Sequence, residues 1–441
     1  MKKLTRLSII LLLAACTAAS AAACGTAAPE TENSSTADPP AGTDAAEGVP
    51  SDAAAAENVP AGAAAPEDTR PVIRIVSESP EEKSSAAAGK TGSDSASPEA
   101  PGSGSASPAA PESAGRVLPA APDGTFTITF AGDILMDPGY AAGDALTKRG
   151  AAGCFDEDAL SLMRGSDLFV VNNEFAYTSG GKAVSKKFNF RADPKHAHIL
   201  TDMGADLVTL GNNHTYDYGE EGLLDTLDTL EREGIPYIGA GRTQEEAESP
   251  FVFTVGGFRV SLLNAEAILF NNSAPAQSAQ GDKPGTFDSY RPEMLYEAVR
   301  RAKADSDYCI VIMHWGSEGK STPNEKQLAL SKGAAEAGAD LIIGGHPHVL
   351  QGISLLGNVP VCYSLGNYLF HSGTYDTGVI QAVLRPSDRR LETLRFVPMQ
   401  CRNMKVYTLS GNEKERLLSD MRSLSPGTQI DDDGRVGLPG H

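Results

Sequence analysis

From Thr125 onward the chain repeats one pattern, in which a short apolar run ends in polar residues and an amphipathic segment follows. The apolar runs predict strands at 125–131, 167–171, 206–210, 308–313, 340–343 and 359–363. Helical spacing of apolar residues predicts helices at 195–204, 223–233, 292–304 and 325–337. This alternation predicts a layered α/β domain. A hairpin expected at 252–263 and strand character at 379–398 indicate that its sheets are mixed.

Polar residues with one shared chemistry, that of metal ligands, follow directly after these predicted strands. They are Asp133, Glu174, Asn213, His214, His314, His346 and His348. Because the carboxyl ends of the strands form the ligand-binding edge of layered α/β folds, we expect these side chains to converge. Carboxylate, amide oxygen and imidazole together suit divalent ions such as Mn, Fe or Zn. Two-metal sites of this composition activate water for phosphoester hydrolysis.

Each of these residues also has an ordinary structural explanation when it is taken alone. Asp133 would cap the next helix, Glu174 would be a surface charge, and His314 would be a core histidine bonded to the backbone. None of these explanations accounts for the repeated occurrence of metal-ligand types at strand ends, where four of the 8 histidines lie. A metal site is therefore the favoured interpretation.

Two further polar residues are expected to support the site from behind the ligands. Asn212 precedes the predicted ligand Asn213, and Asp217 follows His214 by three residues. Asp217 would orient the imidazole of His214 through a hydrogen bond. Capping of the following helix is the alternative role for Asp217.

The first quarter of the chain has a different composition. Residues 1–24 resemble a secretory signal, with positive residues before the apolar run 7–13. The run Leu13-Ala14-Ala15-Cys16 resembles a bacterial lipobox and predicts lipidation of Cys16, with Cys24 as a weaker candidate and an ordinary signal peptide as the alternative. Residues 25–120 are rich in Ala, Pro, Ser and Glu, so we expect a disordered tether.

The remaining chain divides into a domain at 121–405 and a C-terminal tail at 406–441. The signal predicts export, and the lipobox predicts a lipoprotein held at the extracellular face of the cell membrane.

The formal charge of -20 argues against a nucleic-acid partner, because phosphate binding needs clustered Lys and Arg. It also means that a polyanionic ligand would need bound cations as mediators.

Several motifs in consistent order resemble the CapA family of capsule or poly-γ-glutamate synthesis proteins. They are Phe130-Ala131-Gly132-Asp133, Asn172-Asn173-Glu174, Gly211-Asn212-Asn213-His214-Thr215-Tyr216-Asp217-Tyr218-Gly219, His314-Trp315-Gly316-Ser317-Glu318, Gly338-Ala339-Asp340-Leu341-Ile342-Ile343-Gly344-Gly345-His346-Pro347-His348 and Tyr363-Ser364-Leu365-Gly366-Asn367. They span roughly 125–370, a stronger signal than any single motif. The family is similar in fold to calcineurin-like metallophosphoesterases, which implies a four-layered α/β/β/α sandwich.

The resemblance also implies a role for each predicted site residue. Asp133 would bind one ion, and Glu174 would bridge two. One of the two ion sites would be completed by Asn213, His314 and His346, and the other by His348. His214 would be the general acid that protonates the leaving group.

Two positions depart from the metallophosphoesterase pattern. Those enzymes carry a histidine two residues after the first aspartate, where this chain has Leu135. They also carry an aspartate where this chain has Glu174. A leucine cannot bind a metal ion, so the site that contains Asp133 has fewer ligands than usual.

The resemblance implies a membrane-anchored envelope protein in the synthesis or export of an anionic polymer, poly-γ-glutamate. Its partners would be that polymer or its synthesis machinery, and the lipid bilayer through the N-terminal anchor. The predicted ligands support a second hypothesis, a secreted metal-dependent hydrolase of phosphoester or amide bonds. The leucine at position 135 supports a third, a binding or scaffold module with a structural metal.

Overall fold

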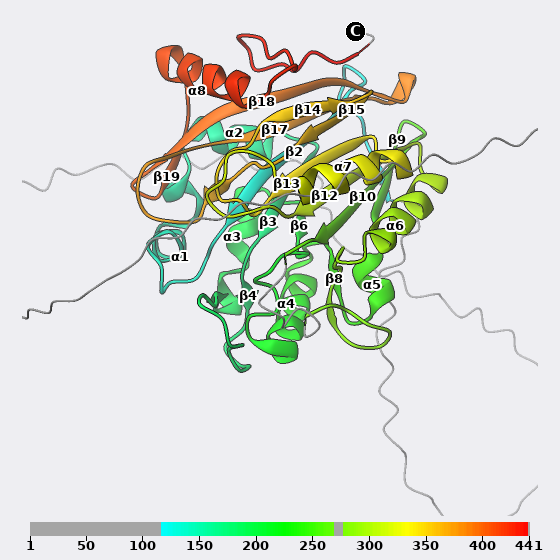
Figure 1. Ribbon diagram of the computed structural model, residues 1–441. Coiled ribbons are helices and arrows are strands. Elements are labelled where there is room, and N and C mark those ends of the chain that lie inside the picture. Colours follow the sequence, from blue (N-terminus) through cyan, green and yellow to red (C-terminus); the bar gives the residue numbers. More distant parts are fainter. Residues whose placement is uncertain (1–115, 269–276, 440–441) are drawn as a thin grey trace, which may run out of the picture. The chain divides into compact units, whose positions relative to one another are not determined.

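The computed structural model describes residues 116–268 and 277–439. The predicted signal, both candidate lipidation sites Cys16 and Cys24, and nearly all of the predicted tether lie outside these residues. Within them the chain forms two large mixed sheets with helices on their outer faces (Figure 1). None of the helices in these two ranges is long and apolar enough to cross a membrane.

The first sheet has 8 strands, in the order β19-β18-β17-β2-β3-β6-β7 with β16 paired to β2. The bounds are β2 (Phe126–Ile134), β3 (Leu168–Asn173), β6 (Leu207–Thr209), β7 (Tyr237–Ile238), β16 (Asn367–Leu369), β17 (Tyr375–Arg385), β18 (Arg390–Arg402) and β19 (Lys405–Thr408). The strands β2, β3, β6 and β7 run parallel, whereas β17 is antiparallel to β2. The parallel part therefore brings the carboxyl ends of three predicted strands to one edge.

The second sheet has 7 strands, in the order β1-β9-β10-β12-β13-β15-β14. The bounds are β1 (Arg116–Leu118), β9 (Phe251–Val255), β10 (Phe258–Glu266), β12 (Tyr308–His314), β13 (Leu341–Gly345), β14 (Ile353–Leu356) and β15 (Val359–Cys362). Its centre, β10-β12-β13-β15, is parallel, and β9 and β10 form the predicted hairpin. Two small pairs complete the strands: β4 (Ala176–Tyr177) with β5 (Arg191–Ala192), and β8 (Ala240–Gly241) with β11 (Gly285–Thr286).

Helices cover the outer face of each sheet. The first sheet carries α1 (Ala141–Cys154), α2 (Glu157–Arg164), α3 (His198–Met203) and α4 (Gly219–Glu233), and the second carries α5 (Gln244–Glu248), α6 (Pro292–Ala304) and α7 (Glu325–Ala337). Figure 1 shows α6 and α7 on the opposite side of the two sheets from α2 and α3. The four-layered α/β/β/α sandwich is thus confirmed.

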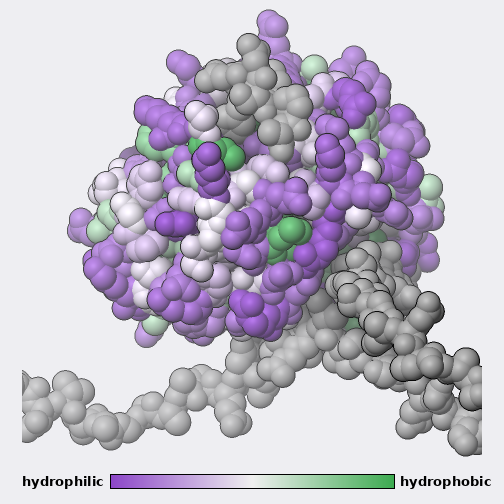
Figure 2. All heavy atoms as spheres, turned by 90° about the horizontal axis from the view of Figure 1, so that it is seen from below, coloured by the Kyte–Doolittle hydropathy of each residue, from purple (hydrophilic) through white to green (hydrophobic). Residues whose placement is uncertain are grey.

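Three apolar cores hold these layers together. One lies between the two sheets, and it includes Phe130 of β2, Leu262 of β10 and Ile312 of β12. The other two lie between each sheet and its helices. Few large apolar side chains in the described ranges are exposed, and the face in Figure 2 is mostly hydrophilic. The alternation of side chains along each strand therefore decides which residues reach the space between the sheets.

Local signals set several helix bounds. The predicted helices at 292–304 and 325–337 are α6 and α7, and α7 begins with a capping box between Asn324 and Gln327. The predicted helix at 195–204 is split into a 3₁₀ turn at Pro194–His196 and α3. Its end is as expected, because Gly204 adopts the left-handed conformation at φ 87°.

The structure differs from the predicted domain limits at both ends. The strand β1 lies within 25–120, the range predicted to be disordered, and it pairs in parallel with β9. The segment 406–441, predicted to be a tail, contributes most of β19 and the helix α8 (Gly411–Leu424). Leu417, Leu418 and Met421 of α8 are buried in the core between the sheets. Burial of these side chains is the reason why the segment is part of the domain.

Candidate metal centre

The predicted ligands meet where the carboxyl ends of both sheets face each other. Asp133 is the last residue but one of β2, Glu174 follows β3, and Asn213 follows β6 in the first sheet. In the second sheet, His314 ends β12, and the pair His346 and His348 follows β13. Five of these six residues are at most 5% exposed, so they are nearly closed off from solvent.

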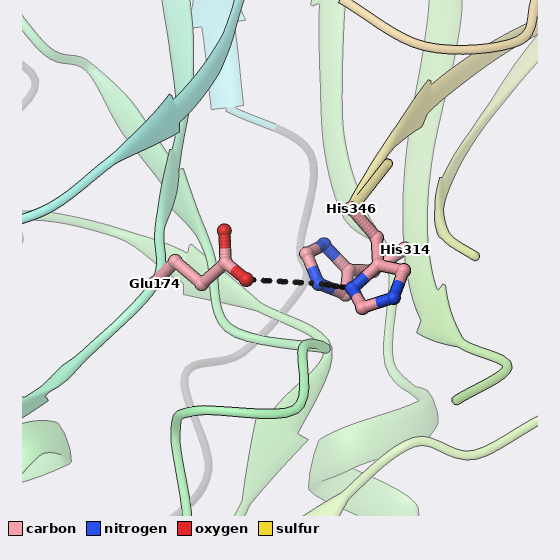
Figure 3. A group of neighbouring side chains, drawn as sticks. All are labelled: Glu174, His314 and His346. Carbon is pink, nitrogen blue, oxygen red and sulfur yellow. Dashed lines mark hydrogen bonds and ion pairs between the residues drawn. The ribbon is translucent and has the colours of Figure 1, made fainter. Parts of the chain in front are cut away.

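Two groups of ligand atoms share one carboxylate. Glu174, His314 and His346 form the first group, and Asp133, Glu174 and His348 form the second. Within each group the candidate ligand atoms all lie within 4.8 Å of one another. Figure 3 shows Glu174 pointing across the edge toward the two rings of the first group. A shared carboxylate between two groups is the arrangement that a bridged pair of ions requires.

In the first group, several atoms with lone pairs surround one ring nitrogen of His314, which can carry only one proton. Nε2 of His314 lies 2.7 Å from Oδ1 of Asn213 and 3.2 Å from Oε1 of Glu174. It also lies 3.2 Å from Nδ1 of His346. A single ring N–H can satisfy only one of these atoms, whereas a divalent cation accepts lone pairs from all of them. The predicted ligand Asn213 therefore belongs with the first group.

Glu174 gives a direct test of whether the residues fit a metal ion. The residue is 0% exposed, and its Oε1 accepts no hydrogen bond in the part of the chain that the structure describes. Burial raises the pKa of Glu174 well above its ordinary value, and the charge of Asp133 adds to this effect. An ionised carboxylate in such a place needs a cation. The donor set of carboxylates, imidazoles and one amide oxygen thus fits a divalent ion.

The imidazoles of the first group are held in the form that binds metal. Burial lowers the pKa of His314 to about 4, and burial with the neighbouring His314 lowers the pKa of His346. A neutral ring offers a lone pair, which a protonated ring does not. The backbone supports the same interpretation, because His346 and His348 adopt φ values of 90° and 60°. Non-glycine residues in this region are strained, and such strain gathers at functional sites.

The second group is built less completely. Nδ1 of His348 lies 3.5 Å from Oδ2 of Asp133, and Nε2 lies 3.9 Å from Oε1 of Glu174. Burial lowers the pKa of His348, but the carboxylates of Glu174 and Asp133 outweigh it, so the net shift is upward. Leu135 packs into the apolar core between the first sheet and its helices. Its side chain provides no ligand atom to the second group.

Asn172 and Asn367 support the ligands and were not predicted as site residues. Nδ2 of Asn172 donates to Oδ1 of Asp133 over 2.8 Å, and its Oδ1 accepts from the predicted support residue Asn212 over 3.0 Å. Oδ1 of Asn367 lies 2.7 Å from Nδ1 of His348. Both residues stand in the quoted motifs, Asn172 just before Asn173 and the predicted ligand Glu174, and Asn367 at the end of the last motif, and this position is the signal that would have found them.

His214 lies beside the ligands in a network of its own. Its Nδ1 is 2.7 Å from Oδ2 of Asp217, which also accepts the N–H of Phe190 over 2.6 Å. Lys186 forms an ion pair with Asp217 and donates to the carbonyl of Asn213 over 2.6 Å. The helix α4 begins at Gly219, and its N-cap makes no side-chain hydrogen bond. Asp217 is therefore placed to orient His214 rather than to cap that helix.

Burial also sets the protonation of this network. It raises the pKa of Asp217 to about 7, against the opposing effect of Lys186. It lowers the pKa of His214 well below its ordinary value, and Lys186 adds to that shift. The ring of Phe190 lies 4.2 Å from that of His214, centroid to centroid. The imidazole is thus held between an apolar ring and a hydrogen-bonded carboxyl group, which fixes its orientation.

The chain is similar to capsule synthesis proteins in sequence, and one phosphatase structure aligns with it. A model of the family described as bacterial capsule synthesis protein PGA_cap matches residues 127–372. The PGA biosynthesis protein CapA of Bacillus subtilis is 29% identical over 269 residues, which cover 60% of this chain and 69% of that protein. The capsule biosynthesis protein CapA of Bacillus anthracis is 30% identical over 285 residues, which cover 62% and 67%. A phosphatase structure from Mycoplasma pneumoniae aligns with a TM-score of 0.41 at 14% identity, over 63% of this chain and 94% of that one.

Proposed function

The chain belongs to the family of bacterial capsule synthesis proteins, and from this premise we propose that it acts in the synthesis or export of poly-γ-glutamate through a divalent-metal site. The observation that carries the proposal is the pair of ligand groups that share Glu174. The printed names of the Bacillus relatives, which refer to PGA and to capsule biosynthesis, supply the polymer.

The candidate ligands would divide between two ions. His314, His346 and Asn213 would hold one ion together with Glu174, and Asp133 and His348 would hold the other with the same carboxylate. A bound divalent ion supplies Lewis acidity and a positive charge at the edge of the sheets. Mn, Fe and Zn suit these ligand types.

Charge explains why a polyanion would need such a site. The chain carries a formal charge of -20, so an acidic polymer meets overall repulsion. Two divalent ions between Asp133, Glu174 and the polymer carboxylates would reverse the local sign. This supports a polymer contact that depends on metal.

The N-terminal sequence supports a place at the membrane. The signal-like residues 1–24 and the lipobox ending in Cys16 favour export and a lipid anchor at the extracellular face. The Ala/Pro/Ser/Glu-rich segment that follows has the composition of a tether. In this arrangement the partners would be the bilayer, the polymer and its synthesis machinery.

A second candidate function, a metal-dependent hydrolase of phosphoester or amide bonds, is favoured by the network around His214. Asp217 holds Nδ1 of the ring, which leaves Nε2 to exchange a proton with a reacting group, and the low pKa of His214 means that the ring would first take up the proton that it later passes to a leaving group. Lys186 fixes Asp217 and the carbonyl of Asn213, so the network is tied to a predicted ligand. Such positioning is typical of general acids.

One experiment on the full chain separates these functions. Bound metal is measured by elemental analysis, and binding and cleavage of poly-γ-glutamate and of a generic phosphodiester are followed with and without chelator. Polymer binding that chelator abolishes, without cleavage, supports the polymer role. Cleavage that is lost in His214→Ala with metal retained supports the hydrolase, and the exposed His198→Ala is the matched control. Tight metal with neither binding nor cleavage would leave only a structural metal, and a chain without metal would end both proposals.

A further inference from the structure

A polar group that the proposed function does not use adjoins the metal centre on the second sheet. Glu266 is the last residue of β10 and lies in register with His314 of β12. It shares its face of the sheet with Leu262, which is in the core between the sheets, because side chains alternate along a strand. Asn264, between these two on the same face, accepts the N–H of Gly211 over 2.6 Å. The side chain of Glu266 therefore lies on the same face of the sheet as that of His314, at the edge where the strands end.

Only one of the two carboxylate oxygens of Glu266 has hydrogen-bond partners among the described residues. The residue is 0% exposed, and its Oε1 accepts from Nε2 of Gln277 over 2.8 Å and from Oγ1 of Thr286 over 2.5 Å. Oε2 has no hydrogen-bond partner among the described residues. A buried acceptor without a partner is costly, so its persistence calls for a ligand or a bound water.

Tyr290 brings a complementary group to the same place. Both the N–H and the hydroxyl of Ser289 donate to the carbonyl of Glu266 over 2.7 Å, so Tyr290 is the next residue along a segment bound to Glu266. The hydroxyl of Tyr290 is buried and, within the described part of the chain, has no partner. Lys326 donates to the carbonyl of Ala267 over 3.0 Å and lies 4.9 Å above the Tyr290 ring.

The two free atoms differ in kind, and this difference selects the ligand. Oε2 of Glu266 accepts and the hydroxyl of Tyr290 donates, yet no hydrogen bond joins them. A carboxylate ligand would be repelled by Glu266 and by Asp288, whose backbone forms an isolated β-bridge with that of Glu266. An ammonium ligand would compete with Lys326, which already supplies a cation to Glu266 and Asp288 and lies 4.9 Å from the centre of the Tyr290 ring. A neutral amide has one donor and one acceptor and meets neither obstacle.

We propose that Glu266 and Tyr290 bind an amide group of the ligand, with Oε2 of Glu266 accepting the amide N–H and the Tyr290 hydroxyl donating to the amide carbonyl. The inference rests on the proposed function, because a γ-linked polymer presents an amide next to each carboxylate. The metal centre would hold the carboxylate, and this neighbouring pair would read the linkage. The site would thereby discriminate a polyamide from other polyanions.

The test compares two polymers of similar charge on the metal-loaded full chain. Poly-γ-glutamate carries amides, and polyacrylate carries carboxylates alone. We expect the wild type to bind poly-γ-glutamate about tenfold more tightly, as two hydrogen bonds would give. Glu266→Gln places a donor opposite the amide N–H, and Tyr290→Phe removes the donor to the carbonyl. Both should bring the preference close to one, while the exposed matched controls Glu297→Gln and Tyr407→Phe keep it.

Each outcome separates this inference from the function on which it rests. Equal binding of the two polymers by the wild type overturns the amide site and leaves the polymer role intact, and it is the result expected if a water fills the place. A preference that survives in both variants, with folding confirmed by circular dichroism, also overturns it. If neither polymer binds, the polymer role fails. A γ-glutamyl dipeptide observed by saturation-transfer NMR then decides the amide site alone: a signal that Glu266→Gln removes supports it, and an unchanged or absent signal overturns it.

Discussion

The two ligand groups that share Glu174 differ in how completely the fold builds them. The first group has two histidines that are at most 5% exposed, and Asn213 adds a fourth ligand. The second has only Asp133 and His348 beside the shared carboxylate, and the side chain of His348 is 20% exposed. More ligands in a drier place hold an ion more tightly. The comparison therefore predicts one stronger and one weaker ion site in this centre.

Removal of the shared carboxylate should have the largest effect. We expect Glu174→Gln to weaken both ions by more than about 100-fold, because it removes a charged ligand from each group. In chelator at pH 8 the same variant should unfold at a higher temperature than the wild type, since burial disfavours the charged form of Glu174. Elemental analysis and thermal unfolding measure the two effects, and Glu297→Gln is the exposed control.

Loss of only one ion in Glu174→Gln would contradict the shared role of this carboxylate. Retention of both ions would mean that the carboxylate is a buried structural acid. A variant that loses both ions but is less stable in chelator would show that Glu174 is held by hydrogen bonds rather than by cations.

The two histidines of the His-Pro-His turn should separate the sites. His346→Asn is expected to remove the tightly bound ion, because His346 belongs to the first group only. His348→Asn should remove only the weaker ion, since the first group stays intact. Metal titration with a competing chelator resolves the two affinities, and His198→Asn controls for loss of an exposed histidine. Equal losses in both variants would end the distinction between a strong and a weak site.

The ligand types were predictable from the sequence, because each predicted ligand follows an apolar run whose period marks a strand. The strands at β12 and β13 and the helices α6 and α7 are recognised for the same local reason. Among the supporting residues, Lys186 was not predictable in this way. It comes from a loop before β5, so only tertiary contacts bring it to His214.

The missed elements have a similar physical cause. The helix α1 is rich in Ala and Gly, so its sequence lacks a clear helical period of apolar residues. Gly150 within it adopts φ 64°, which interrupts the helix. The helix α8 becomes part of the domain only because its apolar side chains close the core between the sheets. Burial against distant segments overrides what a local window of sequence can show.

Leu135 offers a way to ask whether the weak site can be completed. Its side chain is 1% exposed and packs in the core on the helix side of the first sheet. We therefore expect Leu135→His to destabilise the domain by about 4 kcal/mol rather than to add a ligand, because it removes apolar contacts and buries an imidazole. Denaturant unfolding in chelator measures the loss. Tighter binding of the weaker ion in this variant would show that the turn after β2 can rotate toward the centre.

Glu266 extends the comparison to a carboxyl group outside both ligand groups. Burial raises its pKa from 4.5 to about 7 against two hydrogen bonds that lower it. The unfolded state therefore ionises first, so this contribution to stability is complete below pH 4.5 and is lost as the pH rises toward 7. The loss amounts to about 3 kcal/mol by pH 8. Glu266→Gln should remove this part of the pH dependence, measured by urea unfolding in chelator at pH 5 and pH 8. An unchanged difference between the two pH values would show that Glu266 is ionised in the folded state.

The smallest expected effect comes from Asn367, which touches the weaker site only through His348. Oδ1 of Asn367 fixes the proton on Nδ1 of the ring, so Nε2 faces Glu174 with its lone pair free. We expect Asn367→Leu to weaken the second ion about tenfold and to leave the first unchanged. Asn367→Asp keeps the acceptor and should retain the affinity, and the exposed Asn412→Leu is the control. Nitrogen-15 NMR of the histidine rings reads the tautomer directly. A ring that stays protonated at Nδ1 in Asn367→Leu would mean that the carboxylate of Asp133, 3.5 Å away, sets the tautomer instead.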